Sequence, residues 1–241
     1  MSRDTSNPAP RCPVPVLSLH VGQVRPLGPE GRPSAIAKEA VRDLRRITAF
    51  GLEGDAQADL QHHGGPDKAL HHYPREHYAA WRSALPDRAG LFVPGGFGEN
   101  LSTQGLTEDT VCLGDIFSLG SALVQVAQGR KPCWKLNARF GVEDMARRVQ
   151  DTGRTGWYYR VLEEGDVAVG AGLTLVERPC PHWPLSRLWR VLNQSPADRE
   201  SLAEVAALQV LAPGWRETAR KRLESGEAEG LKQQLGRLFG R

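Results

Sequence analysis

The chain of 241 residues has no long hydrophobic run, and no stretch approaches the roughly eighteen apolar residues that a membrane-spanning helix needs. No signal peptide is evident either, because the first dozen residues are polar and rich in proline. A strong excess of one charge is also missing: 31 Lys and Arg stand against 28 Asp and Glu, a net +3, and the basic residues are scattered. We therefore expect a cytoplasmic protein whose main partner is neither a membrane nor a nucleic acid.

Cysteine is scarce as well. The four cysteines, Cys12, Cys112, Cys133 and Cys180, form no CxxC pair and no Cys/His spacing of the zinc-finger kind. This pattern excludes a disulfide framework and argues against a structural zinc site. Each thiol is then available for packing or for chemistry, and for Cys112 and Cys180 we favour a structural role.

Glycine and proline interrupt short β-type segments between residues 15 and 115, a pattern that favours a barrel or closed sheet. A strand through Val14 and Leu19 is expected to turn near Gly22 and to return through Ile36 and Val41. Three further strands are expected at 111–113, 116–119 and 123–126, joined by tight turns. We predict a mainly β domain with α-helices, built as a closed β-barrel with peripheral helices.

Two helices are predicted beside these strands. One begins at Pro74, and its apolar stripe consists of Tyr78, Trp81 and Leu85. The other carries apolar residues at 142, 145, 146 and 149 and ends before Gly153. This second helix follows Cys133 directly.

The composition changes near Pro179, where prolines cluster. We therefore predict a disordered N-terminus (1–13), a β-barrel domain (14–180) and a C-terminal three-helix domain (181–241). Short amphipathic helices bury their stripes only by packing together. The three stripes are Leu185, Leu188 and Leu192; Leu202, Val205 and Ala206; and Leu231, Leu235 and Leu238.

The stretch from Gln128 to Asn137 holds the best candidate for a reactive sulfur. Arg130, Lys131 and Lys135 surround Cys133 with positive charge, which favours the thiolate and lowers the pKa of a thiol. Proline at 132 stiffens the loop. The alternative is that this cysteine is a small packed hydrophobe.

A second dense segment places histidines around the turn Gly64-Gly65-Pro66. Five histidines at 62, 63, 71, 72 and 77 invite a zinc hypothesis, but adjacent side chains do not converge readily on one ion from a strand. An anion site suits the glycines better, with His63 and Lys68 as donors. A solvated polar hairpin remains the plain alternative.

Two further segments carry weaker signals. The glycines of residues 95–98 lack the context of a nucleotide-binding loop, and the neighbouring Asn100 offers an amide to the edge of a heterocycle. Arg154 and Arg160 flank Trp157, Tyr158 and Tyr159, a combination that suits a flat anionic ligand but also plain strand packing.

Taken in order, the segments GLEGDAQAD, HHGGPDKALHHYPREHY, FGENL, LGDIFSLG, residues 128–137 and RTGWYYRVLEEG resemble the MOSC domain family. The resemblance covers about Val16 to Pro179 and is strongest to the stand-alone bacterial, YiiM-like branch, which carries a C-terminal three-helix domain. It implies a β-barrel that binds the molybdenum cofactor, a pyranopterin with a dithiolene and a phosphate. Molybdenum ion binding and pyridoxal phosphate binding are family-level properties.

In this branch the resemblance further implies reduction of small N-hydroxylated compounds, such as hydroxylaminopurine bases, hydroxylamines and amidoximes. Cys133 matches the family cysteine, which binds molybdenum or handles its sulfur, and a thiolate is a soft ligand suited to that metal. Lys68, Arg130 and Arg154 are expected to hold the phosphate and the pterin oxygens. His63, Asn100 and Gln128 are expected to bind the heterocycle or the substrate.

No ferredoxin-type cysteine spacing is present, so electrons are expected from a separate protein. The chain is expected to be a monomer or a homodimer. Two other functions stay open: a sulfur carrier that holds a persulfide on Cys133 for cofactor assembly, and a non-enzymatic module that binds a pterin or an anion.

Overall fold

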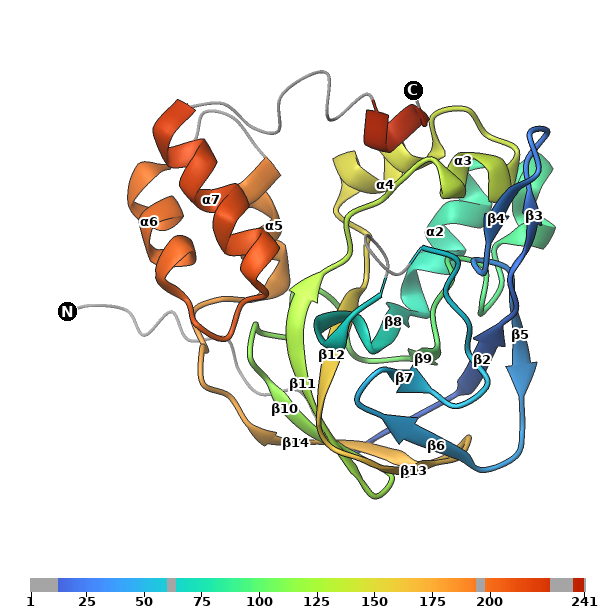
Figure 1. The fold of residues 1–241 in the computed structure, drawn as a ribbon, viewed down its shortest axis with the longest axis horizontal. Helices are drawn as coiled ribbons and strands as arrows, with labels where there is room; N and C mark the ends of the chain where they lie inside the picture. The colour runs from blue at the N-terminus through green and yellow to red at the C-terminus, as the bar shows by residue number, and fades with distance from the viewer. Residues whose placement is uncertain (1–12, 60–63, 194–197, 226–235, 241) are drawn as a thin grey trace.

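The computed structural model describes residues 13–59, 64–193, 198–225 and 236–240. Strands dominate the chain before residue 180, and helices dominate the part after it (Figure 1). The strands are β1 (Val14–Pro15), β2 (Ser18–Gly22), β3 (Arg25–Leu27), β4 (Arg32–Ser34), β5 (Lys38–Val41), β6 (Arg45–Thr48), β7 (Gly51–Leu52), β8 (Leu70–Pro74), β9 (Leu101–Thr103), β10 (Ile116–Leu119), β11 (Ala122–Gly129), β12 (Trp157–Glu163), β13 (Gly165–Val167) and β14 (Gly172–Glu177). The helices are η1 (Pro66–Lys68), α2 (Glu76–Ala84), η2 (Pro86–Leu91), α3 (Lys135–Phe140), α4 (Met145–Thr152), α5 (Leu185–Asn193), α6 (Arg199–Ala207) and α7 (Pro213–Ser225).

The central element is a nine-stranded sheet in the order β1-β14-β10-β11-β12-β8-β9-β2-β5. Its ladders are antiparallel except for the parallel pairing of β8 with β9. A three-stranded sheet, β13-β6-β7, and the hairpin β3-β4 accompany it. The protein is therefore a mixed α/β fold with a C-terminal helical region.

The prediction of β structure with peripheral helices and a C-terminal helical region is confirmed, but the fold is mixed α/β rather than mainly β, and the sheet is a strongly curled, open half-barrel rather than a closed barrel. Its two edge strands in the described residues, β1 and β5, do not pair with each other. The short segment between β1 and β2 draws the ends of the curl together, since Val16 N donates to Ala171 O (2.9 Å) and Leu17 N to Ser102 O (3.0 Å). β1 is only two residues long and ends in proline, which has no N–H to donate. It therefore cannot extend the hydrogen-bonded ladder at this edge of the sheet.

Most expected strands are present. β2 pairs with β5, with Leu19 opposite Val41, and β10 forms a hairpin with β11. The strand expected at 111–113 is wrong: Cys112 makes only an isolated bridge to Pro184. The reason is a turn, in which the Asp115 carboxylate accepts the Cys112 amide at 2.9 Å and bends the backbone away from a ladder.

Both predicted helices before residue 180 exist, with shifted starts. α2 begins at Glu76 because Pro74 ends β8, and Tyr78 and Trp81 face the core as expected. α4 ends at Thr152, and Gly153, which caps it, adopts φ 70°. The short helix α3, directly after Cys133, was not predicted.

The helical region contains α5 and α6 where leucine stripes predicted them, whereas α7 was missed. Leu231 and Leu235, assigned to the third helix, lie outside the described residues, as does nearly all of the predicted disordered N-terminus. Residues 236–239 form a helical turn that lies beside α3 and α4 rather than with α5–α7 (Figure 1). The division into domains at 180 stays a prediction.

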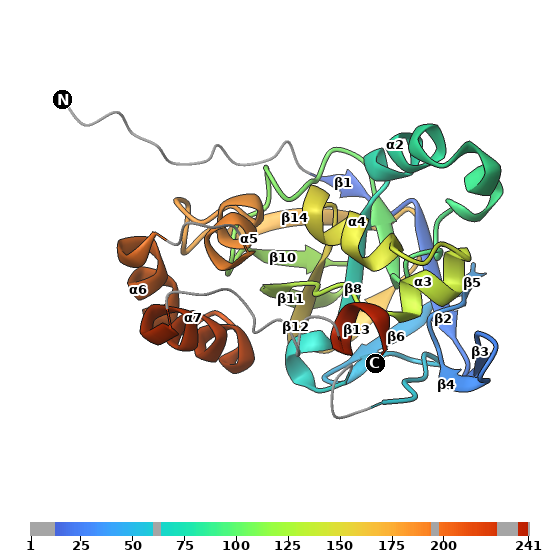
Figure 2. The ribbon, with the colours of Figure 1, turned by 90° about the horizontal axis from the view of Figure 1, so that it is seen from above.

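Two apolar cores hold these parts together. The first joins the inner face of the sheet to α5–α7, and the second lies among α2, α3 and α4 and includes Leu238. The helices consequently flank the sheet on two sides, α5–α7 on one and α2–α4 on the other (Figure 2). Strand β11 leads into the loop between these two helical groups. No helix among the described residues is both long and apolar enough to span a membrane.

Candidate functional site

Cys133 lies on a loop of five residues, 130–134, between the end of β11 and the start of α3. The β11 ladder stops at Gly129, opposite Trp157, and one further backbone bond joins Arg130 N to Gly156 O at 3.1 Å. Pro132 has no amide to continue the ladder, so the chain turns and α3 begins. Cys133 is buried, with only 6% of the residue exposed to solvent.

A cavity of about 700 Å³ opens on one side of Cys133. Six separate parts of the chain line it: Asp59, the segment 64–68 with its glycines, the end of β11 with its loop, Tyr158 of β12, the start of α7, and residues 236–237. Its charged lining residues are Asp59, Asp67, Lys68, Lys131 and Arg237, and its aromatic ones are Trp134, Tyr158 and Trp215. A cavity of this size accepts a drug-sized or cofactor-sized organic molecule.

A smaller hollow of about 40 Å³ adjoins the cavity, and Cys133 and Tyr158 line both spaces. It has room for roughly three water molecules. Lys38, Arg130 and Lys135 line this hollow, and none of its described lining residues is an aspartate or a glutamate. Lys38 is paired with Asp55, which leaves Arg130 and Lys135 as the buried cations that suit an anionic group.

Burial and neighbouring charges perturb the titrating groups around the two spaces. Burial lowers the pKa of Lys135, while Cys133 and Asp59 act to raise it. Burial also lowers the pKa of Lys68, against the effect of Asp59 and Asp67. Burial raises the pKa of Tyr158, and the charge and hydrogen bond of Arg130 oppose this rise. The lysine charges at this site therefore depend on acidic neighbours or on a bound anion.

Four of the residues predicted from the sequence meet here. Cys133, Lys68 and Gln128 line the large cavity, and Arg130 lines the small hollow. Gln128 is buried at the end of β11, where its side chain contributes to the cavity wall. His63 lies outside the described residues.

Asn100 is not brought to either space. Its side-chain oxygen accepts the His71 amide at 3.0 Å, and its nitrogen donates to Asp55 at 2.8 Å and to His20 O at 3.3 Å. The amide is thus occupied in bracing β2 and β8, and the structure gives it no lining position at the cavity.

The glycine turn next to Asn100 holds a carboxylate of the chain, and its Phe97 and Gly98 also line the small hollow. Glu99, fully buried, accepts the amides of Gly95 (2.6 Å) and Phe97 (3.0 Å) and the hydroxyl of Tyr78. Burial raises the pKa of Glu99 to about 7. The glycines therefore wrap a carboxylate of the chain itself.

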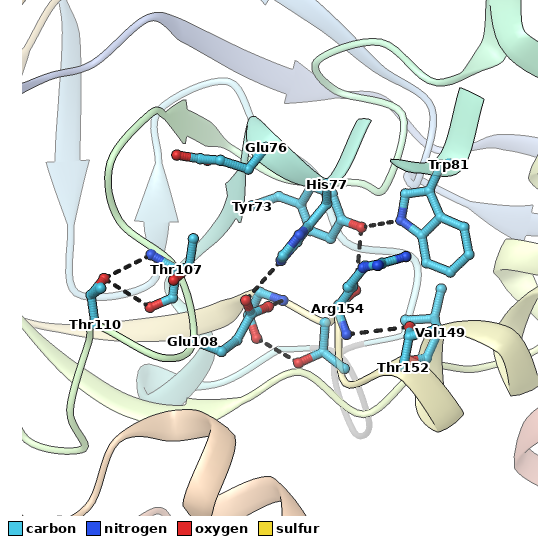
Figure 3. A network of polar contacts seen from close by, with 12 residues as sticks. Tyr73, Glu76, His77, Trp81, Thr107, Glu108, Thr110, Val149, Thr152 and Arg154 are labelled. Atoms are coloured by element: carbon cyan, nitrogen blue, oxygen red, sulfur yellow. Dashed lines mark hydrogen bonds and ion pairs between the residues drawn. The ribbon is translucent and has the colours of Figure 1, made fainter. Parts of the chain in front are cut away.

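Arg154 belongs to a different cluster (Figure 3). Its carbonyl accepts the Tyr73 hydroxyl at 3.2 Å, and its guanidinium lies 5.6 Å from the ring centre of Trp81. Glu108 joins the same cluster through His77 at 2.7 Å and the Gly156 amide at 2.7 Å. Arg154 lines neither space at Cys133, so the expected clamp by this residue is not supported.

His71 and His72 serve the fold. Both ring nitrogens of His72 are engaged, by Tyr159 at 3.0 Å and Thr103 at 2.9 Å, and His71 stacks on Tyr158 at 4.9 Å. Within the described ranges no three His, Cys, Asp or Glu side chains gather as a metal site. The zinc hypothesis also rested on residues 62 and 63, which lie outside those ranges.

Several lining residues were missed from the sequence. Lys38 comes from β5, Trp215 from α7 and Arg237 from the last described segment, all far from residue 133 along the chain. No local motif marks them. Tyr158, by contrast, belongs to the aromatic cluster that the sequence pattern marked.

Comparison with known proteins supports a family assignment. The MOSC domain model matches residues 59–174, and the model of the YiiM-like 3-alpha helix domain matches residues 183–226. Protein YiiM of Escherichia coli is 44% identical over 91% of this chain and 97% of its own length. The crystal structure of YiiM from Escherichia coli superposes with a TM-score of 0.77 at 38% identity, covering 95% of this chain and 99% of that one.

A third relative is a protein of Gibberella moniliformis named "Reductase", which is 36% identical over 90% of this chain and matches over 39% of its own length. The matched helical model covers all of α5, α6 and α7, so the third helix of this region is α7 and not the stripe ending at Leu238. The chain therefore belongs to the MOSC domain family, with a C-terminal region of the YiiM-like three-helix kind.

Proposed function

We propose that the protein is an oxidoreductase that binds a molybdenum cofactor at Cys133 and reduces small N-hydroxylated compounds. The observation that carries the proposal is the position of the Cys133 side chain between a large cavity and a small cationic hollow. Family membership and the relative named "Reductase" support the reaction class. The substrate class follows from the resemblance to the YiiM-like branch.

The donor set fits such a cofactor. A thiolate at Cys133 is a soft ligand for molybdenum. Arg130 and Lys135 are 6% and 8% exposed, so two nearly buried cations face the hollow beside this sulfur, where a phosphate or another anionic group would compensate their charge. Lys68 and Gln128 offer further donors from the large cavity.

Glycine shapes one part of the cavity wall. Gly65 adopts φ 99°, and nothing lies within 4 Å of the position that a Cβ would take. The backbone of this turn therefore leaves open space where a side chain would intrude on a ligand.

When bound, the cofactor supplies the two-electron chemistry that cleaves an N–O bond. The N-hydroxyl compound accepts two electrons and two protons and is released as the amine and water, and a separate donor protein provides the electrons. The chain's own residues bind and orient: Arg130, Lys68 and Lys135 hold anionic groups, and Gln128 hydrogen-bonds the heterocycle or the substrate. Cys133, Arg130 and Lys135 are buried, which limits the access of bulk water to the sulfur.

Metal analysis tests the proposal. Protein from a host competent in molybdenum-cofactor synthesis is expected to carry near-stoichiometric molybdenum and to reduce an N-hydroxylated base with a chemical reductant. Cys133→Ala and Cys133→Ser should lose both properties. Cys180→Ser is the matched control, because Cys180 is a free cysteine that lines neither space.

Molybdenum and activity at parental levels in Cys133→Ala would refute the assigned role of this residue. A persulfide on Cys133 in protein without molybdenum would favour the sulfur carrier instead, and mass spectrometry of the intact protein distinguishes the two. Absence of both metal and persulfide would leave the non-enzymatic binding module.

A further inference from the structure

Residues 236–240 lie directly against the loop that carries Cys133. Leu238 is 2% exposed and packs into the core among α2, α3 and α4. Its carbonyl accepts the side-chain amide of Asn137 at 2.7 Å, and the carbonyl of Gly240 accepts Arg32 at 3.3 Å. This segment is thus anchored on both the helical group and the β3-β4 hairpin.

Arg237 forms hydrogen bonds with the two residues that flank Cys133 in the sequence. Its guanidinium donates to the carbonyl of Pro132, the residue before the cysteine. Its own carbonyl accepts the amide of Trp134, the residue after the cysteine, at 2.8 Å. One residue, distant in sequence, therefore holds the peptide groups on either side of the thiol.

The guanidinium is itself held in place. Its second nitrogen donates to the side-chain oxygen of Gln150 on α4 at 2.6 Å. The backbone carbonyl of Gln150 in turn accepts the indole nitrogen of Trp189 at 3.0 Å, and Trp189 lies 6.1 Å from Trp215. Since Trp215 and Arg237 both line the large cavity, these contacts connect the cysteine loop to the opposite wall.

The other contacts of loop 130–134 involve the residues around Cys133: Lys131 donates to Thr218 at 3.1 Å, and the Trp134 carbonyl accepts the Ala138 amide at 3.2 Å. Pro132 has no amide hydrogen, and the carbonyl of Cys133 accepts only the first-turn amide of Leu136 at 3.0 Å among the described backbone bonds. Charge-assisted hydrogen bonds to a guanidinium are among the stronger contacts available to such a loop.

We propose that Arg237 is a positioning residue that fixes the Cys133 thiol at the boundary between the large cavity and the small hollow. The inference rests on the proposed function only in taking this thiol as the reacting group. Arg237 acts through the loop, by holding Pro132 from its side chain and Trp134 from its backbone.

The test is the rate at which iodoacetamide alkylates Cys133 in the full-length protein prepared without cofactor, followed by peptide mass spectrometry. We expect Arg237→Ala to be alkylated about tenfold faster than the parent, because losing two charge-assisted hydrogen bonds makes local opening of the loop easier. Loss of a nearby positive charge without loss of positioning would act in the opposite direction, since it disfavours the reactive thiolate and slows alkylation.

Two further variants sharpen the result. Arg237→Lys keeps the positive charge, but an ammonium group does not reproduce the two divergent hydrogen bonds of the guanidinium. Alkylation about threefold faster than in the parent supports the positioning role, whereas the parental rate in this variant overturns it. Gln150→Ala removes the brace and leaves Arg237 in the chain, and it should also accelerate alkylation. Should Arg237→Ala fail to fold, Gln150→Ala decides by the same rate. Arg220→Ala, at an exposed arginine on α7, is the control expected to keep the parental rate.

The two proposals fail separately. If the parent protein binds no molybdenum, the proposed function fails, while the alkylation rates still test the role of Arg237. If molybdenum binds and Arg237→Ala reacts at the parental rate or more slowly, the positioning role is refuted and the proposed function stands.

Discussion

The buried ion pair between Lys38 and Asp55 provides the most quantitative prediction. The two side chains are 2% and 6% exposed, and Lys38 lines the small hollow beside Cys133. The Asp55 carboxylate also accepts the Gly22 amide at 2.7 Å and the Asn100 side chain at 2.8 Å. Replacing Asp55 therefore leaves an ammonium group in the interior without its counter-ion.

Asp55→Asn should lower the free energy of unfolding by about 3 to 5 kcal/mol, the cost of breaking a buried pair from one side. The Gly22 amide and the Asn100 side chain donate to different oxygens of the carboxylate, and asparagine keeps only one of them. The loss therefore combines the stranded charge, which is the larger part, with one lost hydrogen bond. Lys38→Met combined with Asp55→Asn removes both charges, and we expect the double variant to recover at least about 2 kcal/mol of the loss.

The pH dependence gives an independent check. Burial lowers the pKa of Lys38, and Asp55 acts to raise it again. Without Asp55 the folded pKa falls further below that of the unfolded chain, so the unfolded state binds more protons and stability rises with pH between these two values. The deficit of Asp55→Asn should therefore be smaller at pH 9.5 than at pH 7.

Urea unfolding followed by tryptophan fluorescence measures all three variants, since the chain contains six tryptophans. Lys38→Met alone completes the double-mutant cycle. The reasoning is refuted if Asp55→Asn costs less than about 1 kcal/mol at pH 7, or if the double variant is no more stable than Asp55→Asn.

Two further changes test other parts of the structure. Gly129→Ala would place a Cβ 2.9 Å from the ring of Trp215, so we expect a loss of about 1 to 3 kcal/mol in urea unfolding and altered tryptophan fluorescence; an unchanged midpoint would show that α7 does not press on β11. Burial lowers the pKa of His72 to about 3, so this histidine stays neutral in the fold while it is protonated in the unfolded chain below its ordinary pKa of 6.5, and stability is lost as pH falls from about 6.5 toward 3. Between pH 7 and pH 5 the parent should therefore lose about 2 kcal/mol more unfolding free energy than His72→Gln. An identical pH profile in the two proteins would contradict this.

Local patterns determined much of the architecture. The apolar segments of β2 and of the β10–β11 hairpin and the glycine turns beside them follow from short-range rules, and so do the apolar stripes of α2, α4, α5 and α6. The special character of residues 130–135 was also visible, because three cations and a proline around one cysteine are adjacent in the chain. α7 escaped because its stripe is weak, and only Trp215, Ala219 and Arg222 are buried.

Only the tertiary structure decided which residues line the cavity and the hollow together with Cys133. Lys38, Trp215 and Arg237 come from segments about eighty to one hundred residues away from it, and no spacing rule relates them. The same folding turned Asn100 toward Asp55 and placed Arg154 against Trp81, although the sequence pattern suited both to a ligand. The residue types available for the chemistry are a property of the sequence, whereas the identity of those that face the sulfur depends on how the curled sheet and the helices close around it.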